Sequence, residues 1–244
     1  MNTSRVSQPE CWAFFDKIYC ISLATRPDRT ELARQQFAKV GLLDRVEFVI
    51  RERHPNNPEQ GIFESHRHCL QRGLAAQAEN ILVFEDDILF HRFNPRAVGD
   101  LGHTLQSIAN WKALFLGGIT SGSHTTAHRN LVAITYRCLA HAYAVKRPFA
   151  EEIAQLSWAG IPFDEVLRRY NRDFYALYPM CAFQGPASSN NKTVTIDRMR
   201  RLCGGLVFIQ QANEFYQNHK RMLQLSSIFL LALALLAWIV WGGQ

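Results

Sequence analysis

Residues 80–90 read NILVFEDDILF, an apolar run followed directly by three acidic side chains and then by a second apolar run. Residues 81–84 do not alternate between apolar and polar, which is typical of a strand covered on both faces of a sheet. The carboxylates therefore follow the carboxyl end of a strand, the edge at which open α/β sheets bind ligands. Adjacent carboxylates repel one another unless a cation or hydrogen bonds hold them. Two interpretations stay open, a divalent metal site beside a phosphate and a solvated acidic turn.

Strand-like and helix-like patterns alternate along most of the chain. This alternation predicts an α/β fold with a central sheet layered by helices. The paired His124 and His128 lie in a polar stretch, 120–129, that reads as a loop, so no helical metal site is expected there. The predicted strands are 17–23, 46–50, 81–84, 113–116, 131–136, 142–145 and 174–178, and the predicted helices are 28–40, opened by a capping box of Asp28 and Glu31, 61–78, 149–156 and 163–170.

Composition limits the class of protein. Charged residues make up 20% of the chain and apolar residues 48%, which excludes a disordered chain and one embedded wholly in a membrane. Lys and Arg exceed Asp and Glu, giving a formal charge of +6. The surplus suits phosphate-bearing small molecules or an anionic bilayer surface. No dense basic tract is present, so a nucleic-acid partner is not expected.

The C-terminal stretch 225–241 reads LSSIFLLALALLAWIVW and follows the basic pair Lys220 and Arg221. Its apolar character, with Trp238 and Trp241 suited to a membrane interface, predicts a single-pass anchor with the body in the cytoplasm. A helix buried in the core of the domain or of a dimer is the alternative. The expected organisation is an N-terminal extension (1–16), a catalytic domain (17–204), a connecting helix (205–222) and a transmembrane anchor (223–241).

Six blocks of sequence, in this order, resemble glycosyltransferase family 25, the lipooligosaccharide-biosynthesis and collagen-type galactosyltransferase group. The resemblance implies a GT-A-type, Rossmann-like sheet that binds a nucleotide-sugar, with helices on both faces and here with a C-terminal apolar helix. It also implies a divalent metal, usually manganese, on the diphosphate of a UDP-sugar. The blocks are IYCISLATRPDRTELARQQF (18–37), GIFESHRHCLQRGL (61–74), ILVFEDDILF (81–90), AYAVKRPFAEEI (142–153), PFDEVL (162–167) and LYPMCAFQ (177–184).

The resemblance and the residue types together nominate the site. Guanidinium groups bind phosphate in a fork geometry, so two arginines after the first strand are candidates for the donor phosphates, although they equally suit a solvated helix entrance. Inverting transfer needs a general base for the acceptor hydroxyl. The base candidate, Asp164, equally suits an acid at a helix N-terminus. The candidates are Glu85, Asp86 and Asp87 for the metal, Arg26, Arg29, Ser65, His66 and Gln184 for the donor, and Asp164 for the base.

The expected function is therefore metal-dependent transfer of a hexose, galactose for preference, from a UDP-sugar to a lipid-linked or oligosaccharide acceptor at the cytoplasmic membrane face. Departures from the family pattern, Glu64 and the amides Asn190 and Asn191, keep a second hypothesis open. In that hypothesis the chain is a catalytically inactive, membrane-tethered binding module. A two-metal phosphoesterase would need further ligands, and none stands out in the sequence.

Overall fold

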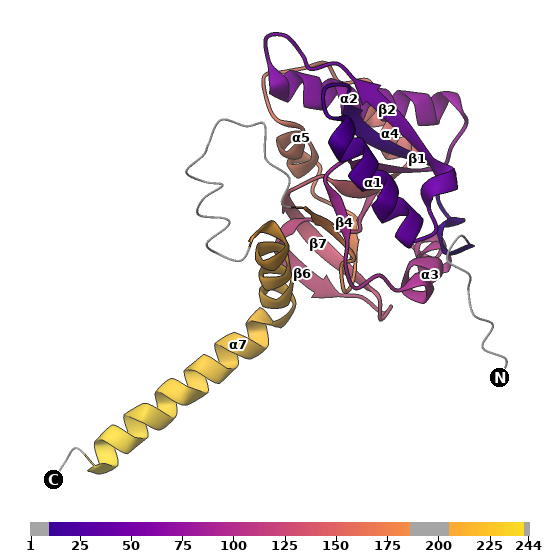
Figure 1. The fold of residues 1–244 in the computed structure, drawn as a ribbon. Helices are drawn as coiled ribbons and strands as arrows, with labels where there is room; N and C mark the ends of the chain where they lie inside the picture. Colours follow the sequence, from indigo (N-terminus) through magenta and orange to yellow (C-terminus); the bar gives the residue numbers. More distant parts are fainter. Residues whose placement is uncertain (1–9, 186–204, 242–244) are drawn as a thin grey trace.

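The computed structural model describes residues 10–185 and 205–241 (Figure 1). Helices and strands alternate along the body, and one long helix, α7, leaves it at the C-terminal end. The strands are β1 (Lys17–Leu23), β2 (Val46–Arg51), β3 (Asn80–Glu85), β4 (Ile88–Phe90), β5 (Ala113–Phe115), β6 (Ile119–Thr125), β7 (Leu131–Cys138), β8 (Ala142–Lys146), β9 (Phe174–Leu177) and β10 (Ala182–Gln184). The helices are α1 (Pro27–Lys39), α2 (Pro58–Ala75), α3 (Pro95–Gln106), α4 (Arg147–Ala154), α5 (Phe163–Arg169) and α7 (Gly205–Trp241), with 3-10 turns η1 (Glu10–Trp12) and η2 (Leu43–Arg45).

The large sheet has eight strands in the order β2-β1-β3-β8-β5-β9-β7-β6. Its first three strands are parallel, and Cys20 of β1 lies in register between Phe48 of β2 and Phe84 of β3. β8 is antiparallel to both of its neighbours, and β7 is antiparallel to β9 and β6. β10 and β4 form a separate two-stranded sheet. The prediction of a mixed α/β fold with a large central sheet is confirmed.

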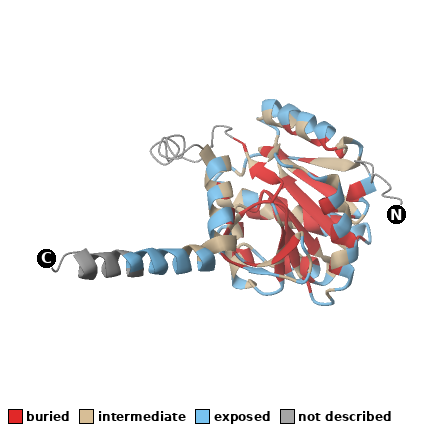
Figure 2. Cartoon of the chain, turned by 90° about the horizontal axis from the view of Figure 1, so that it is seen from below, coloured by how far each residue is buried: buried red, intermediate tan, exposed pale blue. Residues whose placement is uncertain are grey.

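Helices cover both faces of this sheet, which explains why its central strands lack a polar face. In β1, Tyr19 packs in the core that includes residues of α2, α4 and α5, whereas Cys20 packs in the core that includes residues of α1 and α3. In β3, Val83 and Phe84 divide between the two cores in the same way. Figure 2 shows the buried strands between the exposed outer surfaces of the helices.

The helix that follows β1 begins differently from the prediction. The predicted capping box of Asp28 and Glu31 is wrong, because Arg26 is the N-cap residue and no side chain caps the helix. Asp28 instead pairs with the guanidinium of Arg26 at 2.8 Å. A proline at the first helical position fixes a backbone angle suited to a helix, which makes a side-chain cap less necessary.

The polar stretch 120–129, predicted as a loop, contains most of β6. This strand pairs with β7, and α7 covers its outer edge (Figure 1). The Asn213 side chain accepts a hydrogen bond from the Thr120 backbone N–H and donates one to its carbonyl, both at 2.9 Å. Ser123 donates to Asn218 at 2.7 Å. Side-chain amides of α7 therefore make hydrogen bonds at the edge strand β6. The sequence of β6 alone does not indicate these partners.

The predicted membrane anchor and the localisation derived from it are wrong, and nothing in the described residues supports the membrane as a partner. Within 10–185 and 205–241, no helix combines the length and the apolar character needed to cross a bilayer. The side chains described in the apolar part of α7 extend only to residue 233, which makes them fewer than the roughly 20 residues that a span requires. The part before it carries polar groups that bind the body, including Glu214, which pairs with Arg92 at 2.6 Å. The side chains of Trp238 and Trp241 lie outside the description.

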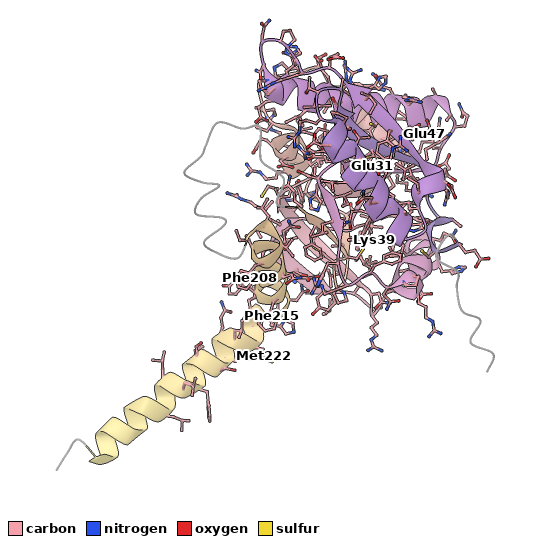
Figure 3. All side chains as sticks on the ribbon, in the orientation of Figure 1. Glu31, Lys39, Glu47, Phe208, Phe215 and Met222 are labelled. Carbon is pink, nitrogen blue, oxygen red and sulfur yellow. The ribbon has the colours of Figure 1, made fainter. Side chains whose placement is uncertain are left out.

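The alternative of a helix buried in the domain core does not hold either for the apolar residues that are described. Residues 225–231 are all exposed, and Phe208, Phe215 and Met222 are exposed along α7 (Figure 3). The connecting helix and the supposed anchor form one continuous helix. Its first half packs on the body and its second half projects from it (Figure 1).

Removing residues 221–244 is therefore expected to leave the body folded. The hydrogen bonds between α7 and the body come from residues before Lys220, so the melting temperature should stay within about 3 °C of the full chain. Asn213→Ala in the shortened chain should lower it by about 3–6 °C, because Thr120 then loses two hydrogen bonds. Thermal unfolding followed by circular dichroism measures both, and a shortened chain without a cooperative transition would contradict this arrangement.

Candidate active site

The carboxyl ends of β1 and β3 lie side by side because these strands are parallel neighbours. Ile21 of β1 is in register with Glu85, the last residue of β3. The next two residues, Asp86 and Asp87, form the turn into β4. The acidic stretch of the sequence therefore lies at the sheet edge where it was predicted, beside the loop that leads from β1 into α1.

Asp86 fastens this turn to β1 and α1. Its Oδ2 accepts a hydrogen bond from Ser22 at 2.7 Å, and its Oδ1 lies 2.8 Å from the guanidinium of Arg29. Ser22 also contacts the hydroxyl of Thr30 at 2.6 Å. Burial raises the pKa of Asp86, while Arg29 and Ser22 act in the opposite direction. Both carboxylate oxygens thus contact groups of the protein, and these contacts tie the turn to β1 and α1.

Asp87 is held by two partners and keeps one oxygen without any. Its Oδ2 lies 2.8 Å from Arg29 and accepts a hydrogen bond from Gln184 at 2.8 Å. Its Oδ1 is buried and has no hydrogen-bond partner among the described residues. An unpaired buried carboxylate oxygen is costly unless a ligand completes its contacts. Asp87 is therefore the acidic residue with a vacant coordination position.

Gln184 reaches Asp87 because β10 pairs with β4. Phe183 faces Leu89 in this antiparallel pair, and Gly185 donates its backbone N–H to the Asp87 carbonyl at 2.7 Å. A side chain at Gly185 would place its first carbon 3.1 Å from that carbonyl oxygen, so the close approach favours glycine. The structure thus brings together two residues that are 97 positions apart and that the sequence assigned to the metal and to the donor.

Glu85 belongs to a different set of contacts. Its Oε1 lies 3.2 Å from Nε2 of His66, and Nδ1 of that ring lies 3.0 Å from the Tyr143 hydroxyl. The His66 ring is stacked on Phe163 at 4.2 Å. Ser65, the neighbouring candidate, donates to the Gly61 carbonyl inside α2 and touches none of the acidic residues.

The environment shifts both partners of the Glu85–His66 contact toward their neutral forms. Burial lowers the pKa of His66 to about 4, with Asp164 acting weakly against it. Burial and the charge of Asp87 raise the pKa of Glu85 to about 8. The side chain of Glu85 is still 29% exposed, so it remains open to solvent or substrate. The contact is therefore a hydrogen bond between uncharged groups near neutral pH, rather than an ion pair.

These pKa shifts predict how stability depends on pH. Between pH 6.5 and 8 the unfolded chain has released the Glu85 proton and the folded chain still holds it, so stability falls as pH rises. Below pH 6.5 the unfolded chain protonates His66 and the folded chain does not, so His66 opposes the Glu85 effect. The wild-type loss from pH 6.5 to 8 should be about 1 kcal/mol, discounted for the partial exposure of Glu85.

Glu85→Gln should remove this loss and leave the variant more stable than wild type at pH 8. Below pH 6.5 the same variant should lose stability as the pH falls, because the His66 effect is then unopposed. Urea unfolding at half-unit pH intervals, without added cation, measures both curves. An unchanged slope between pH 6.5 and 8 in the variant would show that Glu85 does not carry the proton.

Asp164, the predicted base, holds a loop. Its carboxylate accepts hydrogen bonds from the Tyr136 hydroxyl and from the backbone N–H groups of Leu139 and Ala140, the latter two at 3.1 Å. Leu139 has a φ of 72°, a strained value for a side chain of this kind, and Asp164 fixes the backbone at this point. Both carboxylate oxygens are engaged, so the geometry gives Asp164 a positioning role between β7 and β8.

The remaining candidates lie apart from the acidic turn. Arg26 pairs with Asp28 and is not in contact with Asp86 or Asp87. His124 lies on β6 and His128 in the turn beyond it, so the two do not share a helix. Glu64, one departure from the family pattern, accepts a hydrogen bond from Gln60 within α2. Asn190 and Asn191 lie outside the described residues.

A shallow pocket of about 280 Å³ lies beside the acidic turn, between the ends of β1 and β2 and the start of α1. Thr30, which contacts Ser22, is one of its wall residues, so the pocket and the Asp86 contacts share a side chain. Its other walls are Leu23, Ala24, Pro27, Glu31, Arg34 and Ile50, and Figure 3 labels Glu31 on α1. Its size suits a planar ring system, and Pro27 and Thr30 of its wall lie at the start of α1, the helix that carries Arg29.

The described residues do not form a metal site by themselves. No group of three or more His, Cys, Asp or Glu side chains among them is placed to hold an ion. The prediction that Glu85, Asp86 and Asp87 hold a divalent ion therefore stays a prediction, and Asp87 is the one of the three with a buried oxygen that no described group satisfies. Mg²⁺-like ions are commonly bound by one or two carboxylates together with substrate phosphates. The vacant oxygen of Asp87 fits that mode.

No protein-family model matches the chain, and no curated protein matches it. Solved structures with partial similarity include UDP-glucose pyrophosphorylase complexed with UDP-glucose, at 9% identity and TM-score 0.40, covering 66% of this chain and 72% of that one. A glycosyltransferase involved in glycosylation of the major capsid of PBCV-1 has 12% identity and TM-score 0.38, with coverages of 66% and 81%. Mannose-1-phosphate geranyltransferase from Thermus thermophilus has 9% identity and TM-score 0.39, with coverages of 66% and 73%. TM-scores below 0.5 carry no functional argument, so the site must be interpreted from its own residues.

Sequence reasoning missed four residues that shape the site. Ser22 and Thr30 orient Asp86, and Tyr136 and Tyr143 hold Asp164 and His66. The two tyrosines lie in strands whose patterns indicated only a buried core. Ser22 could have been found from the sequence, because a hydroxyl in the mostly apolar stretch 17–23 needs a hydrogen-bond partner when it is buried.

Proposed function

We propose that the chain is a metal-assisted glycosyltransferase that moves a hexose from a UDP-sugar to a glycan hydroxyl. One observation carries the proposal. Asp87 and Asp86, at the carboxyl end of β3, converge with Arg29 from α1 and with Gln184 from β10. An acidic pair, a phosphate-binding cation and an amide at one sheet edge are the groups that a sugar diphosphate needs.

The donor is proposed to lie across the ends of β1 and β3. Its nucleoside suits the pocket beside Thr30, and its diphosphate suits the arginines at the start of α1. Arg26 is proposed as the outer phosphate contact, because among the described residues its guanidinium pairs with the exposed Asp28 and with no other carboxylate at contact distance. Uracil as the base and galactose as the sugar follow from the family resemblance.

Asp87, with Asp86 beside it, would hold the divalent ion implied by this family. When bound, such an ion neutralises the charge that develops on the departing diphosphate. Gln184 donates to the Asp87 carboxylate, and the Gly185 N–H holds the backbone carbonyl of the same residue. The protein thereby presents one oxygen, Oδ1, in a defined position.

Glu85 is the better placed general base. It is partly exposed, and with a pKa of about 8 it can act as a base in the fraction of molecules that have lost its proton, a fraction that grows as the pH rises toward 8. His66, held by Tyr143 and stacked on Phe163, fixes its orientation. Asp164 remains the proposal from the family resemblance, and the mutant comparison in the Discussion separates the two.

The alternative, a catalytically inactive binding module, has less support from the geometry. Glu64 faces a partner within its own helix, so this departure does not disturb the acidic turn. Purified protein incubated with a panel of nucleotide-sugars tests the choice. We expect Mn²⁺-dependent release of UDP from one of the UDP-hexoses, whereas binding of UDP without turnover of any donor would favour the inactive module.

A further inference from the structure

Arg29 lies between the two carboxylates of the β3–β4 turn. Its Nη2 is 2.8 Å from Oδ1 of Asp86 and 2.8 Å from Oδ2 of Asp87. The three side chains are 13%, 7% and 10% exposed. Charges this well buried attract one another more strongly than charges at the surface, because water and salt screen them less. Arg29 is therefore the cation that pairs with both acids, and its single positive charge balances one of their two negative charges.

The contacts between Arg29 and Asp87 leave two buried polar atoms without hydrogen-bond partners among the described residues. Oδ1 of Asp87 and Nε of Arg29 are both buried, and neither has a partner within the described part of the chain. A guanidinium and a carboxylate usually pair through two parallel hydrogen bonds, and this pair uses one nitrogen and one oxygen. Each group therefore has one unsatisfied atom, an oxygen whose contacts a cation would complete and a nitrogen whose contacts an anion would complete.

We propose that Arg29 is a resident counter-ion which a divalent cation displaces from Asp87, and that the diphosphate of the donor accepts the released guanidinium. The inference rests on the proposed function and adds a coupling between its two ligands. The cation alone binds weakly, because it must compete with Arg29 for the same carboxylates. The nucleotide offers Arg29 another anion, so it weakens this competition.

The coupling works in both directions. If UDP raises the affinity for the cation by some factor, the cation raises the affinity for UDP by the same factor. Part of any such factor comes from direct contact between cation and phosphate. The part that belongs to Arg29 is distinguishable, because it disappears when Arg29 is replaced while the carboxylates and the nucleotide are kept.

Arg29→Gln should therefore bind Mn²⁺ more tightly than wild type in the absence of nucleotide, by about tenfold, because a competing positive charge is gone. The factor by which UDP tightens Mn²⁺ binding should shrink in the same variant. Arg29→Lys should fall between the two, since a single ammonium point charge replaces the planar guanidinium. Electron paramagnetic resonance of free Mn²⁺ gives these affinities without any turnover.

Arg72→Gln is the matched control. Arg72 pairs with Glu47 at the surface, so the substitution removes the same charge away from the acidic turn. Its Mn²⁺ affinity should equal that of wild type. Equal tightening in both glutamine variants would overturn the proposal, because net charge alone would then explain the effect.

Unchanged or weaker Mn²⁺ binding by Arg29→Gln, with a normal circular dichroism spectrum, would also overturn it. If Arg29→Gln does not fold, Arg29→Lys decides, and affinity equal to wild type in that variant counts against the proposal. Absence of Mn²⁺ binding in every protein, with and without UDP, would instead reject the proposed function. Failure of the coupling and failure of the function are thus separate results.

Discussion

Asp87→Asn is expected to lower Mn²⁺-dependent transfer at least about a hundredfold, as loss of a ligand to the ion implies. The amide keeps the shape of the side chain and its place between Arg29 and Gln184, but it removes the charge that a divalent ion requires. Initial rates of UDP release at saturating UDP-sugar measure the effect. Asp100→Asn, an exposed acid on α3, is the control for charge and should be unaffected.

A fully active Asp87→Asn variant would contradict the metal assignment. A variant that loses activity together with its folded structure would not test it, so thermal unfolding accompanies the assay. We expect a melting temperature close to that of wild type. The substitution removes the ion pair with Arg29, which lowers stability. It also removes a buried carboxylate with an unsatisfied oxygen, which raises stability, so the two effects oppose each other.

Glu85→Gln is expected to lower transfer by about two to four powers of ten while UDP-sugar affinity stays within a few fold, because a general base acts only on the acceptor proton. Glutamine can keep the hydrogen bond to His66, so the loss is not attributable to a displaced ring. Transfer rate and donor binding are measured on one preparation. Near-normal transfer by this variant would exclude Glu85 as the base.

Asp164→Asn provides the comparison. The Asn side chain has one accepting oxygen in place of two, so it cannot accept hydrogen bonds from the backbone N–H groups of both Leu139 and Ala140 in the same way. We therefore expect the free energy of unfolding to fall by about 2 kcal/mol. Below its melting temperature the variant should retain transfer within about tenfold of wild type, since the reacting groups are intact. A stable Asp164→Asn protein with a loss of two to four powers of ten would restore Asp164 as the base.

The sequence predicted the centre of the fold well because its signals there are local. The mostly apolar stretch 17–23 and the apolar run 81–84 are strands with cores on both sides, and the acidic residues follow the second of them as predicted. The edge of the sheet was predicted poorly. β6 has few apolar residues because its edge is covered by polar side chains, and Asn213 and Asn218 of α7 accept its hydrogen bonds. A side-chain amide far along the chain leaves no pattern in the strand that it covers.

The candidate site divides in the same way. Residue type and strand position identified Asp87, and the resemblance supplied Gln184, but neither indicated that the two side chains touch. That contact depends on the pairing of β10 with β4. The double contact of Arg29 depends on the position of α1 against the turn, which the sequence does not specify. The assignment of Asp164 as a base stays a prediction, and the sequence did not indicate that two backbone N–H groups of a loop donate hydrogen bonds to its carboxylate.

Crystals of the chain grown with UDP and MnCl₂, measured at the manganese absorption edge, test the central claim most directly. Anomalous scattering locates the ion without reference to activity. We predict one strong peak at about 2.2 Å from Oδ1 of Asp87, with the diphosphate on its other side and the Arg29 guanidinium turned from the carboxylates to the phosphates. Bound UDP with no manganese at Asp87, or UDP away from the carboxyl ends of β1 and β3, would contradict the proposed site.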